Sequence, residues 1–193
     1  MQTAILLIAA LSLIQGQQPR VQLGQKAPEF SLRDIEGKEV AFSKISKDKI
    51  TVVDFWSAKC PYSQSWEKRL TAIYEEYKKK GVEFAVVDSN STEPVAEIRE
   101  YLAKSKVPYT IYLDPRSELA DLFGAKATPH VFVFDKKGSL AYVGAIDDDS
   151  KGEKKTEERK NYLREALDAL LGDKEPPLRE TKPVGCSIKK PKA

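Results

Sequence analysis

The fold of this chain is decided by residues 51–63, TVVDFWSAKCPYS. The first six residues are mostly β-branched or aromatic, which predicts a short strand covered on both faces of a sheet. A brief connection then leads to Cys60, and Pro61 suits the first position of a helix, where a missing N–H costs no hydrogen bond. The stretch therefore predicts a strand, a loop and a helix that begins at a cysteine.

The predicted helix after Cys60 has one apolar face and stops before Gly81. Its apolar residues at helical spacing are Trp66, Leu70, Ile73, Tyr74 and Tyr77. A thiol at a helix N-terminus faces unpaired backbone N–H groups and the positive end of the helix dipole, and Lys59 adds a neighbouring positive charge. We therefore expect Cys60 to ionise readily and to act as a nucleophile. The alternative is a buried cysteine that packs as a small apolar residue.

The motif around Cys60 resembles that of thioredoxin. The run Asp54-Phe55-Trp56, followed after three residues by Cys60, matches the thioredoxin pattern, and the segment 25–47 resembles the N-terminal extension of the redoxin group. That group holds the alkyl hydroperoxide reductase and thiol-specific antioxidant proteins. In the resulting Cys-Pro-Tyr-Ser motif, the resemblance places Cys60 on the nucleophilic cysteine and Ser63 on its partner cysteine. Ser63 cannot form that disulfide, but its side chain can hydrogen-bond the thiolate.

The resemblance implies an α/β, thioredoxin-like fold, in which helices flank a central mixed β-sheet. We expect an N-terminal β-hairpin extension, a thioredoxin-like domain over 25–172 and an extended tail over 173–193. The sequence pattern predicts strands at 51–56, 82–88, 107–113, 131–134 and 140–143, and helices at 61–80, from about 94, at 115–123 after an Asp114 cap, and at 163–171. Ser91 or Thr92 is the expected cap of the second helix.

Thr128-Pro129 precedes a predicted strand and resembles the cis-proline of thioredoxin. By that resemblance the pair lies beside Cys60, and the backbone of Thr128 pairs with a bound substrate chain. Substrate contacts are assigned to these two residues and, around the motif, to Trp56, Lys59, Pro61 and Tyr62. The alternative is a trans-proline at the start of an edge strand, since most X-Pro bonds in folded proteins are trans.

Cys186 is the only other cysteine, and it lies in the apolar segment VGCSI at 184–188 of a tail that is otherwise charged and rich in proline. Redoxin-group proteins that end in a Gly-Cys segment after an amphipathic helix resemble this arrangement. Cys186 is thus a candidate resolving thiol for Cys60, and the alternative is a free thiol without a role. Spacing alone does not choose between them, because pairing depends on geometry.

Residues 1–19 contain no charged side chain, and 4–14 form an apolar run that is short for a membrane span. This pattern indicates a signal peptide or a membrane tether, and hence an exported, periplasmic or secreted protein. The alternative is a buried terminal helix in a cytosolic protein.

Charge and histidine content narrow the classes of partner. The chain has 32 Lys and Arg against 29 Asp and Glu, for a net charge of +3, a balance that argues against nucleic acid as a dedicated partner. His130 is the only histidine, so a multi-histidine zinc site is excluded. We expect no cofactor and no metal, and His130 either packs in the strand or tunes the thiol.

The leading functional hypothesis is a thiol-disulfide oxidoreductase. In it, Cys60 attacks a protein or small-molecule disulfide, Cys186 or an external thiol resolves the mixed disulfide, and a thiol donor supplies the electrons. A second hypothesis is a peroxiredoxin-like thiol peroxidase, although Val53 stands where that motif has proline, while Ser57 matches its hydroxyl position. A third is a copper-binding or delivery protein that uses Cys60, Cys186 and His130, because thiolates are soft donors.

Overall fold

The computed structural model describes residues 21–192. The expected signal peptide or tether at 1–19 lies outside the described residues. Among the helices described, none is both long and apolar enough to cross a bilayer.

The strand and helix predicted from residues 51–63 are both present. Strand β3 spans Thr51–Trp56, and all six of its residues are buried, as expected for a strand covered on both faces. Helix α2 spans Pro61–Lys79, with Cys60 as the N-cap residue and Pro61 at the first helical position. Cys60 therefore stands at the junction of the central strand and the longest helix.

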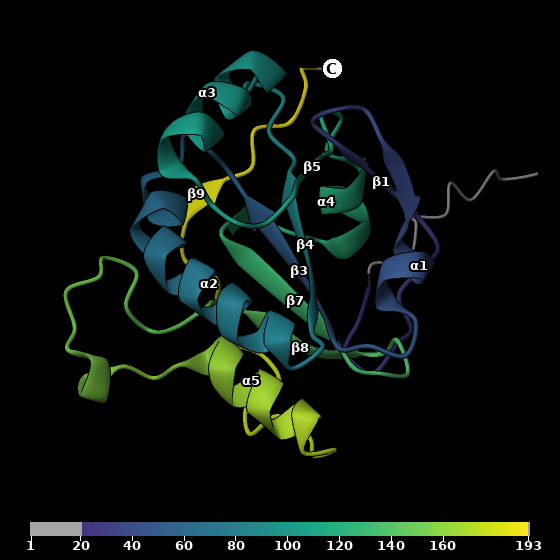
Figure 1. The fold of residues 1–193 in the computed structure, drawn as a ribbon, viewed down its shortest axis with the longest axis vertical. Coiled ribbons are helices and arrows are strands. Elements are labelled where there is room, and N and C mark those ends of the chain that lie inside the picture. The colour runs from purple at the N-terminus through teal and green to yellow at the C-terminus, as the bar shows by residue number, and fades with distance from the viewer. Residues whose placement is uncertain (1–20, 193) are drawn as a thin grey trace, which may run out of the picture.

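A seven-stranded mixed sheet forms the centre of the molecule, in the order β2-β1-β5-β4-β3-β7-β8 (Figure 1). Strand β3 pairs in parallel with β4 and antiparallel with β7, so the Cys60 strand is central. The predicted N-terminal hairpin, β1 and β2, extends the sheet at one edge by pairing with β5. The other elements are β1 (Ser31–Asp34), β2 (Glu39–Ala41), α1 (Phe42–Ser46), β4 (Glu83–Asp88), α3 (Val95–Ser105), β5 (Ile111–Leu113), α4 (Glu118–Phe123), β6 (Ala127–Thr128), β7 (His130–Phe134), β8 (Leu140–Gly144), the 3-10 turn η1 (Thr156–Glu158), α5 (Tyr162–Leu171) and β9 (Cys186–Ser187).

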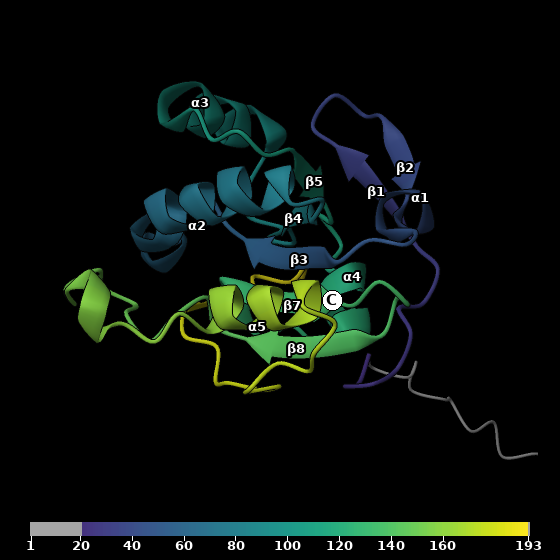
Figure 2. The ribbon, with the colours of Figure 1, turned by 60° about the horizontal axis from the view of Figure 1, so that its bottom comes forward.

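Alternating side chains of β3 build two cores, one on each face of the sheet. Val52 and Trp56 pack with α2, α3 and α5, whereas Val53 and Phe55 pack with α1 and α4. Figures 1 and 2 both show α2 alongside β3 and β4, and α5 alongside β7 and β8. This is the helix-flanked mixed sheet that the motif implied.

Three local predictions were wrong. Helix α3 begins at Val95 with Pro94 as its N-cap, and neither Ser91 nor Thr92 caps it, because the extended backbone of Pro94 delays the first turn. The third strand is limited to Ile111–Leu113, since only these residues pair with β4. Helix α4 begins at Glu118 with Ser117 as its N-cap, and not at Pro115 after Asp114. In the loop after β8, Asp147 and Asp149 are buried, because Arg69 forms ion pairs with both.

The tail after α5 is extended, as expected, but it is also docked on the domain. Val143 of β8 donates its N–H to the Arg179 carbonyl and accepts a hydrogen bond from the Thr181 N–H, at 3.0 Å each. The chain then runs to β9, which pairs antiparallel with β6. Figure 1 shows β9 beside the N-terminal end of α2. The tail therefore carries residue 186 back to the centre of the molecule.

Phe123 of α4 joins the aromatic cluster of the second core, with ring centroids 5.2–6.0 Å from those of four other phenylalanines. We expect Phe123→Ala to lower the free energy of unfolding by about 3–5 kcal/mol, because it leaves a cavity among these rings. Denaturant unfolding measures the change. Leu178→Ala, at a residue that is 48% exposed, is the control and should change stability by less than about 0.5 kcal/mol. Similar losses for both variants would contradict this account of the core.

Candidate active site

Cys60 is held where the central strand passes into α2. Its side chain is 2% exposed, and its sulfur lies 2.9 Å from the backbone carbonyl oxygen of Thr128. The Thr128-Pro129 peptide bond is cis, as the motif resemblance implied. The later proline and the thiol therefore meet, although 68 residues separate Cys60 from Thr128.

Cys186 lies directly against Cys60. Both cysteines are free, and their sulfur atoms are 2.7 Å apart across a sequence separation of 126 residues. The contact is set by the ribbon of β6 and β9, in which Thr128 is opposite Cys186 and Ala127 is opposite Ser187. Since a disulfide bond is about 2.05 Å long, only a small further approach separates this pair of thiols from a covalent bond.

Gly185 permits the close approach of the two strands. A Cβ atom at this position would lie 2.1 Å from the Thr128 carbonyl oxygen, closer than real Cβ contacts come. Beyond the cysteine, the Ile188 side chain is buried in the core that α4 covers. Gly185 before the cysteine and the buried Ile188 after it thus hold Cys186 in position against Cys60.

The two thiols are electrostatically unequal. Burial acts to raise the pKa of Cys60, but hydrogen bonds from the Cys186 side chain and from the backbone N–H of Ser63 outweigh it, so its pKa is lowered. Burial and the neighbouring Cys60 raise the pKa of Cys186 to about 11. Cys60 is therefore the more acidic thiol of the pair, and Cys186 keeps its proton to a higher pH. This agrees with the expectation for a thiol at a helix N-terminus.

The remaining motif residues surround the two sulfurs in different ways. Pro61 is exposed and Tyr62 is half-buried, so both reach the surface beside the thiols. Lys59 is exposed, but its ammonium group forms an ion pair with Glu97 and also donates to the Thr92 carbonyl oxygen at 3.1 Å. The positive charge of Lys59 is thus paired with a carboxylate of α3.

Ser63 and Trp56 are both placed inside the protein. The Ser63 hydroxyl is buried with no hydrogen-bond partner among the described residues, so it is the backbone N–H of Ser63 that bonds the Cys60 sulfur. Trp56 is 1% exposed and packs edge-on against Tyr101 in the core. Trp56 offers no surface to a substrate, because its side chain is buried beneath α2 and α3.

Glu93 is an anchor of the thiol loop that sequence reasoning missed. Its carboxylate accepts hydrogen bonds from the Ser57 hydroxyl, from the Ala58 N–H at 2.8 Å and from the Lys59 N–H at 3.3 Å. These three residues form the connection from β3 to Cys60. The DSNSTEP stretch at 88–94 contains the signal, but polar residues just before a helix, such as Ser91 and Thr92, fit the role of helix caps equally well.

The same β4–α3 loop also grips the tail. Asp88 accepts a hydrogen bond from the Asn90 N–H at 2.8 Å, and the Asn90 side-chain oxygen accepts one from the Lys189 N–H at 2.9 Å. Ser91 donates its N–H to the Lys189 carbonyl oxygen at 2.8 Å. Burial and the negative charge of Glu93 raise the pKa of Asp88 to about 8. One loop thus positions the connection to Cys60 and the strand that carries Cys186.

Another buried acid, Asp54, lies in the central strand β3. Its side chain is fully buried, and no well-formed hydrogen bond reaches either carboxyl oxygen from the described residues. Burial raises the pKa of Asp54 to about 7, although the backbone N–H of His130 opposes the shift. Asp54 is therefore largely protonated at pH values where ordinary aspartates are ionised.

His130 is packed rather than directed at the thiols. Its Nδ1 accepts a hydrogen bond from the Lys126 N–H at 3.3 Å, and its ring packs on Phe132 with centroids 4.6 Å apart. Burial lowers the pKa of His130 to about 4. The copper hypothesis requires His130 to meet both cysteines, and over residues 21–192 no group of three or more His, Cys, Asp or Glu side chains converges in that way.

The peroxidase hypothesis assigned the motif hydroxyl to Ser57. That hydroxyl is buried and donates to Glu93, so it is engaged in fixing the loop. Val53, at the position of the motif proline, packs in the second core.

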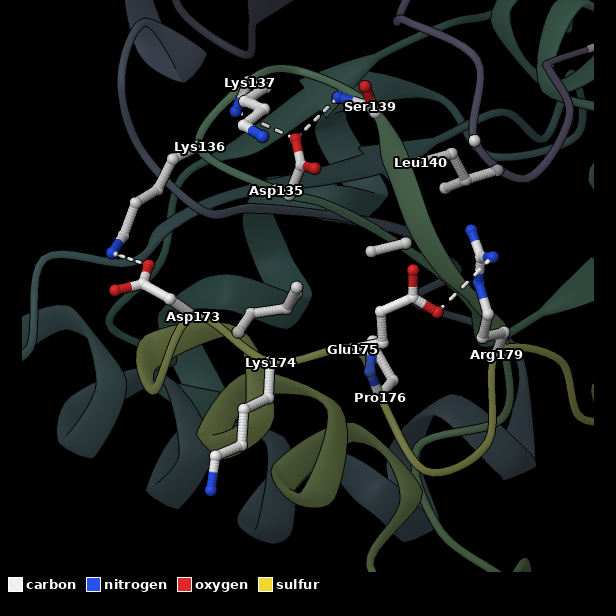
Figure 3. A pocket seen from close by; sticks show the side chains of 13 residues that line it. Asp135, Lys136, Lys137, Ser139, Leu140, Asp173, Lys174, Glu175, Pro176 and Arg179 are labelled. Carbon is white, nitrogen blue, oxygen red and sulfur yellow. Dashed lines mark hydrogen bonds and ion pairs between the residues drawn. The ribbon is translucent and has the colours of Figure 1, made fainter.

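A cavity of about 400 Å³ lies away from the thiols, between the β7–β8 turn and the end of α5. Figure 3 shows that charged side chains line it, including Lys136 paired with Asp173 and Arg179 paired with Glu175. Basic and acidic side chains both line this cavity, and none of the residues predicted for the thiol site is among them. The candidate functional site is therefore the pair of thiols, Cys60 and Cys186.

Comparison with known proteins agrees with the fold and the thiol site. A sequence model of the AhpC/TSA family matches residues 23–143, which contain the hairpin, Cys60 and the cis-proline. The chain belongs to the AhpC/TSA family. Tail residues 173–192, with Cys186, lie beyond the segment that matches.

Relatives of this AhpC/TSA-family chain include the thiol-disulfide oxidoreductase ResA of Bacillus thuringiensis subsp. konkukian, 26% identical over 79% of this chain and 85% of the relative. An uncharacterised conserved protein from Geobacillus kaustophilus is 30% identical, with a TM-score of 0.79 over 89% of this chain and 94% of that one. A putative thioredoxin from Neisseria meningitidis is 27% identical, with a TM-score of 0.55 over 61% of this chain and 77% of that one. The thioredoxin-like fold is thereby confirmed.

The two thiols of this AhpC/TSA-family protein should titrate in separate steps. We expect the first thiolate to form below the ordinary pKa of a cysteine, because the helix N-terminus and Cys186 stabilise ionised Cys60. The second should form only near pH 11, because removing the Cys186 proton places a second negative charge beside the first. The pH dependence of iodoacetamide labelling at each cysteine, resolved by peptide mass spectrometry, measures both steps, and the Cys60→Ser variant identifies the first. Two steps that coincide would contradict the inequality of the thiols.

Moving β9 away should expose Cys60. Gly185→Ala places a methyl group against the Thr128 carbonyl, and we expect the alkylation rate of Cys60 in the reduced protein to rise at least about tenfold, since access limits a buried thiol. Iodoacetamide labelling and peptide mass spectrometry measure the rate, at a pH where Cys60 is ionised in both proteins. Gly172→Ala is the matched control, because its added Cβ would have an ordinary contact of 3.5 Å. Equal rates in both variants would show that β9 does not cover Cys60.

Proposed function

We propose that this protein is a thiol-disulfide oxidoreductase whose redox pair is Cys60 and Cys186. The observation that supports this most directly is the 2.7 Å separation of the two sulfurs at the N-terminus of α2, beside the cis Thr128-Pro129 bond. Two cysteines far apart in sequence, held face to face beside a helix N-terminus, can release two electrons by forming one disulfide and accept two electrons when that disulfide is broken.

In the first half of the reaction, the Cys60 thiolate attacks a substrate disulfide. A bond forms between the Cys60 sulfur and one substrate sulfur, and the other substrate sulfur leaves as a thiolate. The backbone N–H of Ser63 and the positive end of the α2 dipole stabilise Cys60 before the attack. Because Cys60 is almost fully buried, this step requires β9 to move aside.

In the second half, Cys186 resolves the mixed disulfide. Its thiol loses a proton and attacks the Cys60 sulfur, which forms the Cys60–Cys186 disulfide and releases the reduced substrate as a thiolate. The register of β6 and β9 places the Cys186 sulfur within bonding reach when the tail docks again. A thiol donor then reduces the disulfide and completes the cycle.

The proposed substrate surface consists of residues that reach solvent around the pair. Pro61 and Tyr62 lie on the helix side, and Lys59 lies at the edge toward α3. Thr128 and Pro129 lie on the other side, where the backbone of Thr128 is paired with β9. We leave Trp56 out of this surface because it is buried. Protein disulfides and small-molecule disulfides both remain candidate substrates.

We also propose that the protein acts in an oxidising compartment outside the cytoplasm. The support is the uncharged, apolar segment at 1–19, which is typical of a signal peptide or a membrane tether. A Cys60–Cys186 disulfide would persist more readily in such a compartment.

Single-cysteine variants test the proposed function. We expect Cys60→Ser to lose disulfide-reductase turnover, because the nucleophile is absent. Cys186→Ser should consume about one equivalent of substrate and then stop as a mixed disulfide on Cys60, because resolution is absent. Turnover of a chromogenic disulfide and mass spectrometry of the stalled protein measure both outcomes.

Lys174→Ala, in the distant charged cavity, is the control and should retain wild-type turnover. Full activity of Cys60→Ser would rule out the proposed function. Loss of activity in Lys174→Ala would instead point to the charged cavity as a functional site.

A further inference from the structure

The two sulfurs of the redox pair differ in their access to solvent. Cys60 is 2% exposed, whereas Cys186 is partly exposed. The Cys60 sulfur is enclosed by the Thr128 carbonyl oxygen, the first turn of α2 and the Cys186 sulfur itself. Because bond formation needs only a small approach of the sulfurs, this difference should persist in the disulfide.

We infer that the thiol donor that reduces the Cys60–Cys186 disulfide attacks Cys186 and not Cys60. This inference rests on the proposed function and specifies the sulfur that receives the donor.

The direction of attack supports this assignment. In thiol-disulfide exchange the attacking thiolate approaches nearly in line with the bond that breaks. An attack on Cys60 would have to come from the side opposite Cys186, and Cys60 is almost fully enclosed. An attack on Cys186 comes from the side opposite Cys60, where the tail strand is partly open to solvent.

The leaving group supports it as well. When a donor thiolate bonds to Cys186, the disulfide breaks and its electron pair stays on Cys60, which leaves as a thiolate. The N–H of Ser63 is already in place to stabilise that charge, and thiols with lower pKa values leave faster. A second donor thiolate then displaces Cys186, which releases a donor disulfide and takes up a proton.

Charge around Cys186 favours the approach of an anion. Residues 182–192 contain four lysines and no acidic residue. Lys190 pairs with Asp121, but Lys182, Lys189 and Lys192 are exposed. These charges raise the local concentration of a thiolate at the partly exposed sulfur.

The two partners of the protein would then use different sulfurs. A substrate disulfide reacts with Cys60 and requires β9 to leave β6, whereas the donor reacts with Cys186 while β9 stays docked. The docked tail therefore shields the nucleophile without blocking reduction of the disulfide.

Trapping the first adduct tests the inference on the wild-type protein. The oxidised protein is mixed briefly with excess glutathione, quenched in acid, unfolded and treated with N-ethylmaleimide. We expect glutathione on Cys186 and maleimide on Cys60, with the Cys186 adduct at least about tenfold more abundant than the Cys60 adduct. Peptide mapping without reductant measures both.

Reference adducts control for unequal loss during work-up. Cys60→Ser and Cys186→Ser, each loaded with glutathione, provide the two adduct peptides and their recovery after the same quench. Equal adducts, or more glutathione on Cys60, would overturn this inference alone. Failure of oxidised wild-type protein to contain the Cys60–Cys186 disulfide would overturn both the proposed function and this inference.

Discussion

The antiparallel pairing of β9 with β6 is the interaction on which the arrangement of the thiols depends. It contains only two residue pairs, yet it sets the position of Cys186 above Cys60. Backbone hydrogen bonds alone would give a weak contact, so the flanking residues matter. Gly185 lets the strands approach, Ile188 is buried beyond them, and the β4–α3 loop holds Lys189. The contact between the two thiols thus depends on a short strand pairing that several distant elements reinforce.

The difference in pKa between the two thiols follows from the secondary structure around each cysteine. Cys60 lies at a helix N-terminus, where N–H groups are free to stabilise a negative charge. Cys186 lies on a strand, with few such donors, and faces the charge of Cys60. The asymmetry therefore comes from the secondary structure that carries each cysteine. The pKa of neither thiol depends on His130, whose ring packs on Phe132.

The strand, the helix and the reactive cysteine were predictable because their signals are local. Apolar periodicity, Pro61 and Gly81 are read within a few residues of each element, and the cis bond at Pro129 followed from the motif resemblance. The position of Cys186 was not predictable, because its contact with Cys60 joins residues that are 126 positions apart in the sequence. Glu93 was missed for a similar reason, since its carboxylate serves a loop 34 to 36 residues earlier. The burial of Trp56 was not predictable either, because a motif position does not reveal which way a side chain turns.

The tail also crosses the end of the sheet before it reaches the thiols. Strand β8 is an outer strand, and part of its backbone is occupied by hydrogen bonds from Val143 to Arg179 and Thr181. Gly144 allows this crossing, since a side chain there would collide with Thr181. Outer strands with free N–H and C=O groups recruit other polypeptides and promote self-association. The tail that carries Cys186 therefore also covers part of an outer strand. Removal of the tail would expose those backbone groups and lower colloidal stability, in addition to removing the second thiol.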